Sequence, residues 1–207
     1  MLKTIATHLA RKFKRFPYFG RQRFWILYWA YKITGWHIRH EEWDFILKYL
    51  PKLHNMIQHN NILVMDVGCA KSLFGYEVVG RRYKYFGVDI SDEEIYIPED
   101  GFTKADITDC GKAREYDFVT CISVLEHIGN DGKGDYQAQK KAVDNMLNSL
   151  KIGGRLLMTI PTKEFAQGHP WHGFCCADIA HILFKNKGMI IHSEERAGQI
   201  CMAIERI

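Results

Sequence analysis

Acidic residues are absent from the first 40 positions of this 207-residue chain. Nine lysines and arginines give that stretch a formal charge of +9, and the other 19 of the 28 basic residues against 24 acidic ones leave positions 41–207 at about −5. A cationic leader on a mildly acidic domain indicates contact with an anionic partner, either a membrane surface or a nucleic acid.

Paired cysteine motifs, a secretion signal and a membrane-spanning run are missing as well. None of the six cysteines forms a C-x-x-C pair, which argues against a zinc site or a disulfide framework and favours a reducing cytoplasm. The first ten residues lack a continuous apolar core and a cleavage site. The longest strongly apolar run, Phe24–Ile33, contains Lys32 and is too short to span a bilayer. We therefore expect a cytoplasmic protein without a metal site.

Helical spacing of apolar residues dominates the first 50 positions. Segments 2–16, Arg21–Thr34 and Glu41–Tyr49 each predict a helix, and this region holds 13 of the 27 aromatic residues. The pattern predicts a basic, aromatic-rich helical extension over positions 1–55 and a separate domain over positions 56–207.

Short apolar runs alternate with helical stretches from Asn61 onward. An amphipathic helix is predicted over Ala138–Leu150, and only three residues separate the last two apolar runs, which predicts a closing antiparallel hairpin. Alternating strands and helices predict a mostly parallel sheet with helices on both faces, in the α/β class. The predicted strands are Ile62–Val67, Tyr85–Ile90, Phe102–Ala105, Asp117–Val124, Arg155–Ile160, Met189–Glu195 and Gln199–Arg206.

Small or polar residues stand at the ends of four predicted strands. Gly68 and Ala70 follow the first strand, Asp89 ends the second, Asp106 follows the third, and Ser123 lies at the end of the fourth. Ligands of open parallel sheets bind outside the carboxyl ends of the strands, so these residues predict one shared pocket. Small residues let the backbone approach a ligand closely, and a carboxylate can accept two hydrogen bonds from a ribose diol.

Two ligand classes use such a pocket. A dinucleotide needs a G-x-G-x-x-G turn to hold its pyrophosphate, whereas the frame that starts at Gly68 is Gly-Cys-Ala-Lys-Ser-Leu and lacks the second and third glycines. S-adenosylmethionine has no phosphate and needs a diol acceptor, an adenine pocket and room for its methionine part. The sequence favours S-adenosylmethionine.

Five segments carry a family resemblance. ILVMDVGCAKS, YFGVDIS, KADITD, YDFVTCISVLEHIG and LKIGGRLLMTIP resemble, in order and spacing, the motifs of class I S-adenosylmethionine-dependent methyltransferases, over roughly residues 60–207. Ala70 stands where the family often has a second glycine. The resemblance implies a Rossmann-like seven-stranded sheet of order 3-2-1-4-5-7-6 with its last strand antiparallel. It also implies cofactor contacts at Asp66, Gly68, Ala70, Ser72, Asp89, Ile90, Asp106, Ile107 and Ser123.

Methyl transfer to a hydroxyl needs alignment and a base that removes the proton. His127 follows the fourth strand, where the transferred methyl group should point, although a helix-capping role would also explain it. Asp135 and His172 are further candidate bases. The Leu-Glu-His-Ile stretch followed by Gly134-Asp135 is similar to enzymes that methylate sugars in polysaccharide and glycolipid assembly. The expected acceptor is therefore a saccharide or a lipid-linked glycan.

Other functions share these patterns. The chain could methylate RNA or another small molecule, could be a nicotinamide-dependent oxidoreductase, or could be a non-catalytic methyltransferase-like binding module. The cationic residues 1–40 also have several interpretations: a lid over the cofactor pocket, a membrane-surface segment, an RNA contact or a transit peptide. We expect a lid that also places the enzyme on the inner face of an anionic membrane, with nucleic acid a weaker alternative.

Overall fold

The computed structural model describes residues 37–50, 62–70, 72, 74–91, 101–110, 115–129, 135–162 and 188–207. The helices predicted over 2–16 and Arg21–Thr34, and the candidate base His172, lie outside these residues.

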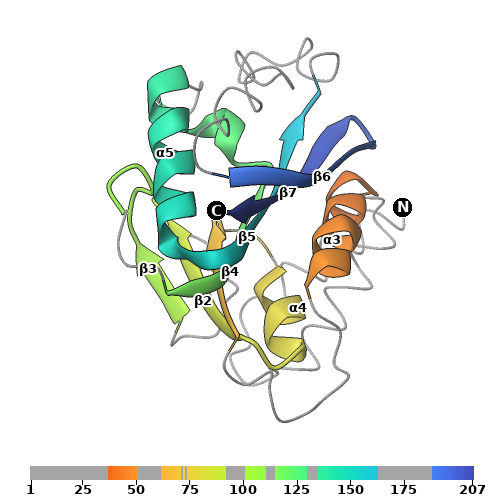
Figure 1. Cartoon of the computed structure of the whole chain (residues 1–207), viewed down its shortest axis with the longest axis horizontal. Helices are drawn as coiled ribbons and strands as arrows, with labels where there is room; N and C mark the ends of the chain where they lie inside the picture. Colours follow the sequence, from red (N-terminus) through yellow and green to blue (C-terminus); the bar gives the residue numbers. More distant parts are fainter. Residues whose placement is uncertain are drawn as a thin grey trace, which may run out of the picture.

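A seven-stranded sheet has the order β3-β2-β1-β4-β5-β7-β6 (Figure 1). Strands β1 to β5 pair in parallel, whereas β7 runs antiparallel to both β5 and β6. This arrangement confirms the predicted α/β fold, its strand order and its reversed last strand. The strands are β1 Leu63–Val67, β2 Lys84–Asp89, β3 Phe102–Lys104, β4 Tyr116–Ile122, β5 Leu150–Pro161, β6 Gly188–Arg196 and β7 Gln199–Arg206.

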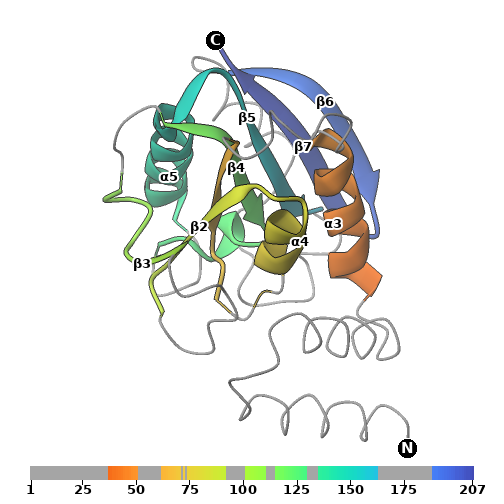
Figure 2. The ribbon, with the colours of Figure 1, turned by 90° about the horizontal axis from the view of Figure 1, so that it is seen from below.

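Helices cover both faces of the sheet: α5 lies on one face, and α3 and α4 lie on the other (Figures 1 and 2). Successive side chains of a strand point to opposite faces, so Met65 joins the core beneath α5 while its neighbour Val64 joins the core beneath α3 and α4. The described helices are α3 His37–Tyr49, α4 Phe74–Gly80, the 3-10 turn η3 Leu125–His127 and α5 Tyr136–Ser149.

Helix α5 shows how its sequence determines its place. Its buried apolar residues recur at helical spacing and pack on the sheet: Ala142, Val143, Met146 and Leu147. The Asp135 side chain accepts a hydrogen bond of 2.9 Å from the Ala138 N–H, which caps the first turn.

Helix α3 packs into the same domain although it precedes β1 and falls within the predicted extension at positions 1–55. Phe45 and Ile46 are fully buried in a core that also contains Val64 and Leu157 of the sheet. Tyr49 and Phe45 also contact the His192 ring on β6, with ring centroids 5.5 Å and 6.1 Å away. The helix therefore stabilises the sheet directly.

Candidate functional site

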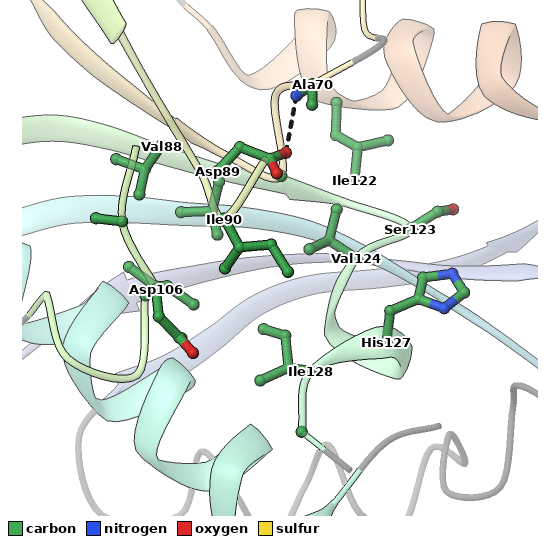
Figure 3. Close-up of a pocket in the computed structure, with 15 residues that line it drawn as sticks. Ala70, Val88, Asp89, Ile90, Asp106, Ile122, Ser123, Val124, His127 and Ile128 are labelled. Carbon is green, nitrogen blue, oxygen red and sulfur yellow. Dashed lines mark hydrogen bonds between the residues drawn. The ribbon is translucent and has the colours of Figure 1, made fainter. Parts of the chain in front are cut away.

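A cavity of about 580 Å³ opens at the carboxyl ends of the parallel strands (Figure 3). Its walls come from the ends of four strands and from η3, at the edge of the sheet where ligands of parallel sheets bind. The lining residues are Val67, Gly68, Ala70, Val88, Asp89, Ile90, Ala105, Asp106, Ile107, Ile122, Ser123, Val124, His127, Ile128 and Gly129.

Gly68 is the first residue of the turn that follows β1. Its φ of +75° lies in the left-handed region, and a Cβ added to it would stand 2.1 Å from Cγ2 of Val124. Its N–H donates to the Val88 carbonyl at 2.8 Å, which ties the turn to β2. Glycine is therefore required here by both backbone conformation and space.

Asp89 ends β2 with its carboxylate held from two sides. Oδ2 accepts from the Ala70 N–H at 2.8 Å, and Oδ1 accepts from the Ser91 N–H at 2.9 Å (Figure 3). Each carboxylate oxygen has a second lone pair, so the group can still accept hydrogen bonds from a diol in the cavity. The fixed orientation favours binding, because little side-chain freedom remains to be lost.

The loop after β3 forms another wall. Asp106 is exposed and its Oδ1 accepts from the Thr108 N–H at 2.7 Å, while Ile107 is buried. From α5, Asn145 Nδ2 donates to the carbonyls of Ile107 and Thr108 at 2.8 Å and 2.7 Å. Together with Ile90, which also lines the cavity, this loop offers apolar side chains beside a carboxylate, a combination that suits a purine ring.

Seven of the nine predicted cofactor residues line the cavity, and the other two, Asp66 and Ser72, are not part of its lining. Asp66 is buried: Oδ2 accepts from the Tyr85 hydroxyl and Oδ1 from the Thr120 hydroxyl, both at 2.7 Å. Burial raises the pKa of Asp66 to about 6, although both hydroxyl hydrogen bonds oppose this shift. Ser72 Oγ accepts from the Phe74 N–H at 3.2 Å at the start of α4. Asp66 therefore links β2 to β4, and Ser72 bonds to the first residue of α4, without either of them lining the cavity.

The predicted bases occupy different places. His127 ends η3, is exposed, and lines the cavity, with Ser123 on the side away from Asp89 and Asp106 (Figure 3). Asp135 caps α5 and does not line the cavity. It lies close to Gly129, which does line the cavity: a Cβ at Gly129 would stand 2.7 Å from the Cβ of Asp135.

The turn after β4 is held by side chains from distant elements. Ser123 has a φ of +50°, and its N–H donates to Oγ1 and to the carbonyl of Thr159 on β5, at 3.0 Å and 3.2 Å. The Ser123 hydroxyl donates to Oε1 of Glu42, a fully buried residue of α3, and the Thr159 hydroxyl donates to the same oxygen at 2.7 Å. Sequence analysis did not identify Glu42 or Thr159, because no motif links α3 to the ends of β4 and β5.

Apart from the predicted Ile90 and Ile107, most apolar residues of the wall were not among the predicted contacts. Val67, Val88 and Val124 could have been found, since each stands next to a predicted contact at a strand end, but Ile128 and Gly129 carry no such signal. Among the described lining residues there is no lysine or arginine that could bind a pyrophosphate. A fixed carboxylate beside an aliphatic wall, without a cation, fits a nucleoside such as the adenosyl group better than a dinucleotide.

Two features are absent from the described part of the chain. It contains no group of three or more histidine, cysteine, aspartate or glutamate side chains placed to hold a metal ion. None of the helices in these same residues combines the length and the apolar character needed to cross a membrane.

Comparisons with known proteins agree on one kind of domain. A family model described as a methyltransferase domain matches residues 36–197. The N-methyltransferase NodS of Bradyrhizobium japonicum WM9, solved with S-adenosyl-l-homocysteine, is 12% identical, with a TM-score of 0.63 over 86% of this chain and 91% of that one. No curated protein sequence matches the chain.

Two more solved structures share the fold at the same low identity. The 1,6-didemethyltoxoflavin-N1-methyltransferase of Burkholderia thailandensis is 12% identical, with a TM-score of 0.62 over 84% of this chain and 80% of that one. A putative methyltransferase solved with the Haloferax volcanii Trm112 methyltransferase activator is also 12% identical, with a TM-score of 0.63 over 86% and 92%. These likenesses establish the fold and leave the acceptor open.

Proposed function

The chain belongs to the methyltransferase domain family and is an S-adenosylmethionine-dependent enzyme, and from this premise we propose that it methylates a hydroxyl group of a saccharide or lipid-linked glycan. One observation carries the proposal: an exposed imidazole, His127, lines the cavity on the side away from Asp89 and Asp106. A hydroxyl needs a base when it acts as a nucleophile near neutral pH, and an imidazole is suited to that task.

The residues at the other end of the cavity fit the cofactor. Asp89 would hold the ribose diol, Asp106 and Ile107 the adenine ring, and the turn at Gly68 and Ala70 would leave room for the amino-acid part. When bound, S-adenosylmethionine supplies an activated methyl group. The protein contributes alignment of the two reactants, which by itself can lower the barrier by several kcal/mol, roughly 7–11 in well-oriented intramolecular reactions.

In this proposal His127 accepts the proton of the acceptor hydroxyl while the wall of the cavity holds the acceptor oxygen in line. Asp135 is a secondary candidate, because its carboxylate already caps α5 and it does not line the cavity. His172 remains a sequence-based candidate for the same role.

The test is methylation of a panel of glycans and lipid-linked saccharides, read by mass spectrometry as the gain of a CH2 unit. His127→Ala should lower turnover by about two to four orders of magnitude and leave S-adenosylhomocysteine affinity nearly unchanged. Asp135→Asn, which can still cap α5, tests the secondary candidate: activity close to wild type leaves His127 as the base, and a comparable loss moves that role to Asp135. A product methylated on nitrogen, or full activity of His127→Ala, would overturn the hydroxyl proposal.

We also propose that residues 1–40 bring the enzyme to an anionic membrane surface, near a lipid-linked acceptor. Their charge of +9 supports this, because each basic residue near such a surface contributes on the order of 1 kcal/mol. Sedimentation with anionic vesicles should fall as salt rises, and neutral vesicles should bind little. If the protein binds RNA tightly and does not bind vesicles, the partner of residues 1–40 is a nucleic acid and the membrane proposal is wrong.

A further inference from the structure

A buried carboxylate from outside the family's usual motifs reaches the pocket wall. Glu42 on α3 is fully buried, and its Oε1 accepts hydrogen bonds from the hydroxyls of Ser123 and Thr159. These two residues stand at or beside the carboxyl ends of β4 and β5, at the edge of the sheet where the cavity opens. Burying a carboxylate is costly unless hydrogen bonds compensate, so this contact calls for a physical role.

The backbone of Ser123 is strained at this point. A residue with a Cβ rarely adopts a φ of +50°, and such a conformation persists only where surrounding contacts impose it. Two anchors impose it here: Thr159 accepts from the Ser123 N–H at 3.0 Å, and Glu42 accepts from the Ser123 hydroxyl. Thr159 is itself fixed by Glu42, at 2.7 Å. One carboxylate therefore bonds to Ser123 directly and also fixes the side chain that accepts from the Ser123 N–H.

The strained turn determines the position of the residues after it. Val124 is the next residue, and its side chain occupies the space that a Cβ at Gly68 would take. Its carbonyl accepts from the His127 N–H at 2.9 Å, which sets the start of η3. A shift of the Ser123 backbone would thus move Val124, which faces Gly68, together with His127, the proposed base.

We propose that Glu42 is a positioning residue of the methyl-transfer pocket, which holds Ser123 in its left-handed conformation and so aligns Val124 and His127. The proposal rests on the proposed function in one respect, namely that this cavity binds the adenosyl cofactor. It extends the active site to a helix that precedes the first strand.

S-adenosylhomocysteine affinity, measured by calorimetry on the full chain, tests the proposal. Glu42→Ala and Ser123→Ala should each weaken binding about tenfold, because each leaves a residue with a Cβ in the strained turn without its side-chain anchor. Adding Ser123→Gly to Glu42→Ala should restore most of that loss, since glycine adopts a positive φ without strain. A general packing defect would not respond to glycine in this way.

Ile46→Ala is the matched control, because Ile46 is fully buried one turn further along α3 and does not line the cavity. It should lower the melting temperature and leave S-adenosylhomocysteine affinity unchanged. Wild-type affinity in Glu42→Ala, or a loss that Ser123→Gly does not reverse, would overturn the positioning role. If the wild-type protein itself binds no S-adenosylhomocysteine, the cofactor assignment fails instead.

Discussion

The two sides of the pocket are built in different ways. On the cofactor side, at the ends of β1 to β3, Asp106 bonds to the backbone two residues on, and Asp89 bonds to Ala70, 19 residues away. On the β4 side, Ser123 and Thr159 bond to Glu42 across 81 and 117 residues. The first side depends mainly on turns and on contacts between neighbouring strands, whereas the second depends on how a distant helix packs.

This difference explains which contacts a single sequence reveals. Turns that need glycine or a side-chain acceptor leave a mark at the strand end itself, because the residue type and the backbone conformation are linked. A contact between α3 and the ends of β4 and β5 leaves no such mark.

Gly68→Ala should have the largest effect, because the new Cβ meets Val124 where the two sides of the pocket touch. We expect a loss of stability of about 2–4 kcal/mol, from positive-φ strain plus overpacking, and S-adenosylhomocysteine binding weakened at least about 100-fold. Gly153→Ala is the control. Gly153 also has a positive φ, +76°, but no atom lies within 4 Å of the position that a Cβ would take. This variant should therefore lose only about 1 kcal/mol of stability and should bind S-adenosylhomocysteine as the wild type does. Equal effects of the two variants in chemical denaturation and calorimetry would contradict the steric account.

Asp89→Ala should remove the charged acceptor of the cofactor side without unfolding the protein. We expect S-adenosylhomocysteine affinity to fall about 10- to 100-fold, since a hydrogen bond to a charged group contributes about 1.5–3 kcal/mol. The thermal shift produced by the ligand should shrink with it. Asp106→Ala, at an exposed position, should lower S-adenosylhomocysteine affinity less than Asp89→Ala does. Titration with NAD serves as a specificity control, and NAD binding tighter than S-adenosylhomocysteine binding would contradict the choice of cofactor.

Asp66 links the two sides through Tyr85 of β2 and Thr120 of β4, and it should make stability depend on pH. Burial raises its pKa to about 6 in the folded state, above the usual value near 3.9 of an unfolded chain. The folded state therefore binds the proton more tightly than the unfolded state. The free energy of unfolding should fall by roughly 2 kcal/mol as the pH rises from about 4 to 6, and it should not change further through Asp66 at higher pH. Urea unfolding at several pH values should show a flatter profile in Asp66→Asn. If Asp66→Asn has the same dependence of stability on pH as the wild type, Asp66 is not the cause of that dependence.

The smallest effects should come from the loop after β3, where the cofactor side also uses a distant helix. Asn145→Ala removes two hydrogen bonds from α5 to the carbonyls of Ile107 and Thr108, and it should cost about 1–2 kcal/mol and weaken adenosine binding slightly. Lys141→Ala breaks a 2.9 Å ion pair with Asp109 between exposed side chains and should change stability by at most about 0.5 kcal/mol. A larger effect of Lys141→Ala than of Asn145→Ala, in denaturant unfolding, would contradict this ranking.

Much of the fold could be predicted because hydrophobic periodicity follows secondary structure. The last strand was predicted over its observed bounds, Gln199–Arg206, and the short gap before it indicated the antiparallel hairpin. The observed β5, Leu150–Pro161, starts earlier than the predicted Arg155, because its first residues carry exposed side chains and a glycine pair that the apolar pattern does not register. Helix α3 likewise begins at His37 rather than Glu41.

By itself, the sequence determined the alternation of strands and helices, the edge of the sheet where the pocket lies, and the residues whose own backbone requires them, such as Gly68. The strand order followed from the resemblance of its five motifs to a known family. Only the tertiary structure decided that Asp66 does not line the pocket, and that Glu42 joins the wall beside Ser123. The physical reason is the range of the forces involved. Turn conformation and strand pattern are fixed by neighbours along the chain, whereas the partner of a buried carboxylate is fixed by which surfaces pack together, and packing is decided by the whole core at once.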